Sequence, residues 1–176
     1  MTPHELIDLQ MRYRFGLFGM VELTSTIREV FERGEWRESF LPFLVEGDLK
    51  EAEAEQILEA LCVDVPAGRL DMEKIARVVD RYMSRGELTW LVGPDLALII
   101  ADDQRVGKLV DSELAWLVEV TCADPFELQG LENDVVVGSY YDPCNSTNDH
   151  IQPLRVAYAE GTIIEGDGYL KFPETE

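Results

Sequence analysis

The first pattern along the chain is a helical repeat of apolar residues. The stretch Thr2-Pro3-His4-Glu5 forms a capping box with proline in the first helical turn, and we therefore expect a helix over residues 3–14. A second apolar stripe predicts a helix over residues 20–33. Gly34 would close this helix in the left-handed conformation.

Two further helices are expected after acidic N-cap residues. Asp48 precedes "LKEAEAEQILEALC", in which apolar residues form one stripe and glutamates point outward. Asp71 precedes "MEKIARVVDRYM", whose buried face would include Ile75 and Val79. Between the helices, "ESFLPFL" is interrupted by Pro42 and predicts a short helix or a bent turn.

The two apolar segments between Pro94 and Pro125 are predicted to form further helices. "DLALIIA" after Pro94 fits a helix, although such a short apolar run also fits a buried strand. Asp111 or Ser112 would cap a helix over "ELAWLVEVTC". We therefore expect an α+β protein that is mainly α, with a bundle of about six to seven short helices in residues 1–125 and an all-helical core.

The composition changes after Pro125. Segments such as "DVVVGSYY" and "PLRVAYAE" are rich in valine and tyrosine, and glycines between the segments supply turns. We expect residues 131–173 to form a small antiparallel β appendage. The two domains would be residues 1–125 and 126–176, packed as one structural unit, with an exposed polar loop at "DPCNSTNDHIQ".

Glycine followed two positions later by a bulky apolar residue recurs irregularly along the chain. Examples are Gly68-Arg69-Leu70, Gly86-Glu87-Leu88 and Gly107-Lys108-Leu109. Because the spacing is irregular, a solenoid is not indicated. We interpret each glycine as a helix stop, which predicts positive φ at Gly68 and Gly86 and burial of Leu70 and Leu88.

Residues 102–113, "DDQRVGKLVDSE", resemble part of a calcium-binding EF-hand loop. Aspartate stands first, glycine sixth and glutamate last. The third and fifth positions, however, are Gln104 and Val106, and valine offers no oxygen ligand. A calcium site is therefore not expected, although the sequence leaves open whether this stretch binds a cation.

Charge is the most informative property of the composition. The 176 residues contain 35 acidic and 15 basic side chains, for a net charge of -20. This field repels nucleic acids and anionic membranes and favours cationic partners. No secretory signal or long apolar segment is present, and the three cysteines are widely spaced, so we expect a cytoplasmic protein with reduced thiols.

Motifs for catalysis are missing. No phosphate-binding loop, dinucleotide fingerprint, nucleophile elbow or zinc-protease motif is present. His4 and His150 have no metal-ligand spacing to cysteines or acids. We expect no enzyme activity, no catalytic residue, no cofactor and no metal site.

Partner binding is the remaining class of function. Acidic and aromatic residues together suit the recognition of a basic protein. The candidates are Glu51, Glu53, Glu55 and Glu59 on one helix face, Asp102 and Asp103, and Tyr140, Tyr141, Asp142 and Asp149 in the β segment.

Two segments within residues 10–120, "MRYRFGLFGMVELTSTIREVFERG" and "YMSRGELTWLVGPDLALIIADDQ", resemble parts of bacterial polymorphic-toxin immunity proteins. The resemblance implies a binding protein that occludes the active site of a cationic toxin domain, and it transfers no individual residue. Two alternatives stay open: an EF-hand-like helical scaffold or regulatory module, and an enzyme that uses carboxylates.

Overall fold

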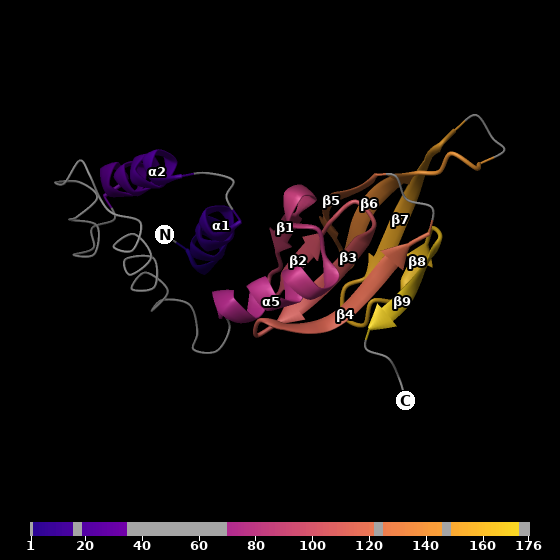
Figure 1. Ribbon diagram of the computed structural model, residues 1–176. Coiled ribbons are helices and arrows are strands. Elements are labelled where there is room, and N and C mark those ends of the chain that lie inside the picture. The colour runs from indigo at the N-terminus through magenta and orange to yellow at the C-terminus, as the bar shows by residue number, and fades with distance from the viewer. Residues whose placement is uncertain (1, 16–18, 35–69, 122–124, 146–148, 173–176) are drawn as a thin grey trace. The chain divides into compact units, whose positions relative to one another are not determined.

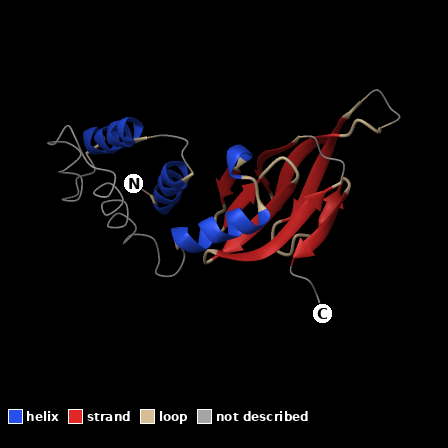
Figure 2. Ribbon diagram, in the orientation of Figure 1, coloured by secondary structure: helices blue, strands red, loops and turns tan. Residues whose placement is uncertain are grey.

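Two antiparallel β-sheets account for most of the described C-terminal part of the chain (Figures 1 and 2). The computed structural model describes residues 2–15, 19–34, 70–121, 125–145 and 149–172. The chain divides into two units, Met1–Met72 and Glu73–Glu176.

The strands of the C-terminal unit follow one another mostly as antiparallel neighbours. Sheet A has the order β1-β2-β3-β4-β9, and sheet B has the order β5-β6-β7-β8. The strands of sheet A are β1 (Thr89–Val92), β2 (Leu98–Ala101), β3 (Arg105–Val110), β4 (Glu113–Val120) and β9 (Gly168–Phe172). The strands of sheet B are β5 (Phe126–Glu132), β6 (Val135–Tyr141), β7 (Ile151–Ala157) and β8 (Ile163–Glu165).

The main hydrophobic core contains side chains from both sheets. Trp116 and Val118 of β4 belong to the same buried cluster as Val136 of β6 and Val156 of β7. Successive side chains of a strand point to opposite faces, so alternate residues enter this core. The two sheets therefore pack face to face, as in a β-sandwich.

Helix α5 (Met72–Tyr82) lies against the other face of sheet A (Figure 1). Its main chain continues through a 3₁₀ turn, η3 (Arg85–Glu87), into β1. The guanidinium of Arg105 donates to the carbonyl of Tyr82 at 2.8 Å, and the rings of Tyr82 and Phe172 lie 6.4 Å apart. Strand β2, which lies between β1 and β3, is buried along its whole length.

The N-terminal unit contains α1 (Pro3–Arg14) and α2 (Met20–Glu32). The capping box is confirmed, because the Thr2 amide donates to Glu5 Oε2 at 2.7 Å and the Glu5 amide donates to Thr2 Oγ1 at 3.2 Å. The Thr2 amide holds the pKa of Glu5 below its usual value. No helix in the described ranges is long and apolar enough to cross a membrane.

The expected mainly helical bundle of six to seven helices and its all-helical core are wrong. Strands β1 to β4 lie within residues 89–120, and the strands of the expected β appendage belong to a sandwich that these four strands complete. Strand β4 shows the reason. Trp116 and Leu117 are both buried although they face opposite sides of sheet A. The segment is therefore apolar on both faces, and its sequence lacks the alternation that distinguishes a strand from a helix.

The helix-stop interpretation of glycine holds at some positions and fails at others. Gly34, two residues after the last residue of α2, has φ +86°, and Leu88 is buried, as predicted. Gly86 lies within η3 and does not have positive φ, while Leu70 is only partly buried. Gly107 lies inside β3, and Gly68 falls outside the described residues.

Residues 102–113 do not have the local structure of an EF-hand. These residues form a turn, strand β3 and a second turn into β4, where an EF-hand requires a loop between two helices. Gly107, the sixth residue of this stretch, is explained by close packing inside the sheet and not by the turn of a calcium-binding loop. A side chain there would lie 3.1 Å from Leu117 Cδ1 and from the carbonyl oxygen of Trp116.

Candidate binding surface

The β6–β7 hairpin brings several of the predicted residues together. Val135 pairs with Ala157 at one end of the hairpin, and Tyr141 pairs with Ile151 at the other. Since the two strands are antiparallel, directly opposed residues lie on the same face of sheet B. Tyr141 and Ile151 therefore form one exposed pair beside the loop that the sequence predicted.

This pair is unusually open to solvent for apolar side chains. Tyr141 is 41% exposed and Ile151 is 64% exposed. Both line a shallow hollow of about 260 Å³ together with Pro125, Glu127 and Ser139, and also Tyr140. A contiguous apolar surface with a polar rim is typical of a protein-binding site.

Three carboxylates, those of Glu127, Asp142 and Asp149, lie near the exposed pair. Asp142 follows Tyr141 and its Oδ1 accepts the Cys144 amide at 2.8 Å, while Asp149 Oδ1 accepts the Ile151 amide at 3.3 Å. The His150 ring lies 5.5 Å from the Tyr141 ring. We call Glu127, Tyr141, Asp142, Asp149 and Ile151 the hairpin surface.

Tyr140 does not belong to the hairpin surface, although it was predicted to bind a partner together with Tyr141. It is 3% exposed, and its hydroxyl accepts the Asp167 amide at 3.0 Å. The pleat of the strand places adjacent residues on opposite faces. Tyr140 is therefore a core residue that joins sheet B to the turn before β9.

Asp102 and Asp103 are not brought to the hairpin surface. Asp102 is only 4% exposed, and its carboxylate accepts the amides of Ser84, Gln104 and Arg105 at 2.8–2.9 Å. Asp103 is partly buried, and its carbonyl accepts the Phe126 amide at 2.6 Å. Asp102 thus organises the turn between β2 and β3 and is inaccessible to a partner. Glu51, Glu53, Glu55 and Glu59, which were predicted to share a helix face, lie outside the described residues.

A cluster of titratable groups lies elsewhere, around Tyr158. The Lys108 ammonium, whose side chain is 7% exposed, lies 3.6 Å from the Tyr158 ring centroid and 3.9 Å from Asp95 Oδ2. The Tyr158 hydroxyl donates to Asp95. Gly93 makes this approach possible, because a side chain there would collide with the hydroxyl.

The electrostatics of this cluster oppose a catalytic role. Burial and the hydrogen bond to Asp95 raise the pKa of Tyr158, so the hydroxyl keeps its proton. Partial burial opposes ionisation of Asp95, but the hydrogen bond from Tyr158 outweighs it with the help of the Ala97 amide and Lys108, and the pKa of Asp95 is lowered. The cluster therefore joins a buried lysine and a tyrosine to a half-exposed aspartate at the edge of the core.

A metal centre has no support in the described ranges. They contain no group of three or more histidine, cysteine, aspartate or glutamate side chains that could hold a metal ion. Comparisons of the chain with protein families, curated proteins and solved structures find no match.

Sequence reasoning missed two members of the hairpin surface, Ile151 and Glu127. Ile151 was included in the polar loop, whereas it is the first residue of β7. Glu127 pairs with Ser139 in the neighbouring strand, a relationship that depends on register. The alternation of polar and apolar residues in both strands was the available signal, but it does not fix the register by itself.

Proposed function

We propose that the protein is a non-catalytic binding protein whose hairpin surface engages a basic partner protein. The observation that carries this proposal is the exposed Tyr141–Ile151 pair with carboxylates around it. The aromatic and aliphatic side chains would supply buried contact area, and the acids would select a cationic partner. The net charge of -20 would accelerate the encounter.

A toxin domain with a cationic active-site cleft is a partner of this chemistry. An apolar hairpin end that enters such a cleft would exclude substrate, and the carboxylates would replace the charges that the substrate normally brings. This form of the proposal agrees with the resemblance to immunity proteins. Its distinguishing consequence is protection of a cell that co-expresses the captured partner.

Affinity capture tests the proposal with the full-length chain as bait. Cells that naturally make the protein would be probed with the wild type and with Tyr141→Ser/Ile151→Ser, and captured proteins identified by mass spectrometry. The matched control is Val110→Ser/Ile164→Ser, which changes two other exposed apolar residues. We expect a basic protein with the wild type and the control, and its loss with the hairpin variant.

Charge reversal provides an independent test of the acidic rim. Glu127→Lys is expected to weaken binding of the captured partner, whereas Glu132→Lys, at the other end of β5, should change it little. Equal weakening by both variants would show that only the overall charge matters. Capture of no basic protein, or equal capture by all baits, would contradict the proposal.

A further inference from the structure

Basic residues recur along one side of α5 in this acidic protein. Lys74, Arg77 and Arg81 are spaced by three and four residues, which places neighbouring members on the same helix face. Val78 and Tyr82 lie between and beside them in the same spacing. This face of the helix is therefore both cationic and apolar.

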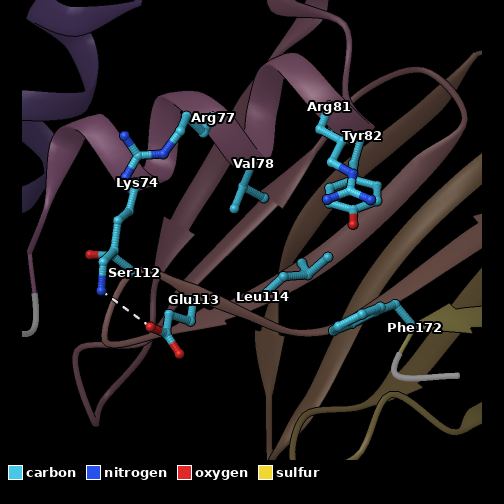
Figure 3. A pocket seen from close by; sticks show the side chains of 9 residues that line it. All are labelled: Lys74, Arg77, Val78, Arg81, Tyr82, Ser112, Glu113, Leu114 and Phe172. Atoms are coloured by element: carbon cyan, nitrogen blue, oxygen red, sulfur yellow. Dashed lines mark hydrogen bonds and ion pairs between the residues drawn. The ribbon is translucent and has the colours of Figure 1, made fainter. Parts of the chain in front are cut away.

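The same side chains line a groove between α5 and sheet A (Figure 3). The groove has a volume of about 420 Å³. Val78 and Tyr82 point from the helix toward Leu114 and Phe172, which form the opposite wall (Figure 3). The result is an open channel with an apolar floor and basic side chains along one edge.

The charges in the groove are only partly neutralised. Lys74 Nζ contacts Glu113 Oε1 at 3.1 Å. Arg77 and Arg81 are exposed, and neither forms an ion pair with any residue that the structure describes. Arg81 instead lies 5.1 Å from the ring centroid of Tyr82. Arg77 and Arg81 thus have no acidic partner within the described part of the chain and can bind an external anion.

We propose that this groove, which we call the α5 groove, binds an acidic peptide segment of a partner protein that carries a hydrophobic side chain. Arg77 and Arg81 would hold carboxylates, for which the planar guanidinium is suited. Val78, Leu114 and Phe172 would receive the hydrophobic side chain. An inorganic anion would leave this apolar floor uncovered, which is why a peptide fits better.

The α5 groove and the hairpin surface share no residue, and the inference does not depend on the proposed function. The overall negative charge repels an acidic ligand at long range. Binding must therefore come from short-range contacts with the arginines and the apolar floor. This requirement would make the groove selective for a segment that carries both carboxylates and a hydrophobic side chain.

Fluorescence anisotropy with the full-length protein tests the proposal. The probe is a short fluorescein-labelled glutamate peptide with one central phenylalanine, and its comparators carry glycine in place of phenylalanine or lysine in place of glutamate. We expect the probe to bind and both comparators to bind more weakly. Arg77→Ala/Arg81→Ala should weaken probe binding at least about tenfold, because two charge-assisted hydrogen bonds are removed.

The control is Arg28→Ala/Arg155→Ala, which removes the same charge outside the groove and should change affinity less than about twofold. Circular dichroism would show that both variants fold, and hydrogen exchange with the probe bound should protect α5 and Leu114. Failure of the wild type to bind the probe, or equal losses in the two variants, would overturn the proposal. Equal binding of the glycine peptide together with displacement by inorganic phosphate would also overturn it, in favour of a simple anion site.

Discussion

The Lys108 ammonium lies over the ring of Tyr158 and also donates to the main-chain carbonyl of the same residue at 3.2 Å. The Trp116 indole N–H donates to that carbonyl as well, at 3.1 Å. One carbonyl from the turn after β7 in sheet B thus accepts side-chain donors from two strands of sheet A. This acceptor links the sheets at the edge of the core.

The shared acceptor predicts energetic coupling between Lys108 and Trp116. Lys108→Met and Trp116→Phe each leave the Tyr158 carbonyl with one donor, whereas the double variant leaves it without either. The double variant should therefore be less stable than the sum of the single effects by about 1 kcal/mol. Urea unfolding of the four proteins would measure this coupling, and additive effects would show that the carbonyl is satisfied in another way.

Two glycines in the β5–β6 hairpin offer a matched test of close packing. A Cβ atom added at Gly138 would lie 2.7 Å from the Glu127 carbonyl oxygen and would also overlap the Phe126 ring. A Cβ atom added at Gly130 would have no neighbouring atom within 4 Å. We expect Gly138→Ala to destabilise the protein by about 1–3 kcal/mol. Gly130→Ala should change stability by less than about 0.5 kcal/mol. Similar unfolding midpoints for the two variants would contradict the described register.

Asp102 should contribute to stability instead of to recognition. Asparagine has one acceptor oxygen, so Asp102→Asn cannot satisfy all three amides that the carboxylate accepts. We expect a loss of about 1–3 kcal/mol in the free energy of unfolding. Asp103→Asn is the control and should be nearly neutral in the same denaturation measurement. A neutral Asp102→Asn would mean that the turn is held by other contacts.

The contacts of Glu119 predict a dependence of stability on pH. Its carboxylate forms an ion pair with Lys171 and accepts the Tyr169 hydroxyl at 2.5 Å, which together hold its pKa below the ordinary value of 4.5. A lowered pKa in the folded state adds stability above the ordinary value, and this contribution is lost as the pH falls through the folded value.

Glu119→Gln should therefore lower the melting temperature by a few degrees at pH 7 and by much less in acid. Thermal unfolding at several pH values would measure this difference, with Glu132→Gln as the control. The same deficit for Glu119→Gln at every pH would rule out the ionised carboxylate as its cause.

The sequence predicted the three described α-helices well because their signals are local. The capping box at Thr2 and the apolar stripe of α5 need no knowledge of the rest of the chain. The strands of sheet A were misread for the opposite reason. Their partners are distant in sequence, and burial on both faces removes the alternation that marks a strand.

The candidate surface was predicted in part. Tyr141, Asp142 and Asp149 were identified from the combination of aromatic and acidic residues, and the hairpin does bring them together. Tyr140 was misplaced because composition does not show which face of a strand a residue occupies. The α5 groove was missed altogether, since its far wall comes from residues 112–114 and 172.

Because β9 pairs with β4, sheet A can be completed only after the C-terminal end of the chain has been synthesised. Strand β4 ends at Val120, and its neighbour begins only at Gly168, after all of sheet B has been made. A chain emerging from the ribosome therefore carries β4 with an open edge until the last strand is synthesised. Pairing of such distant segments is slow, so this edge of the nascent protein stays open to aggregation for longer than an edge covered by the next strand in sequence.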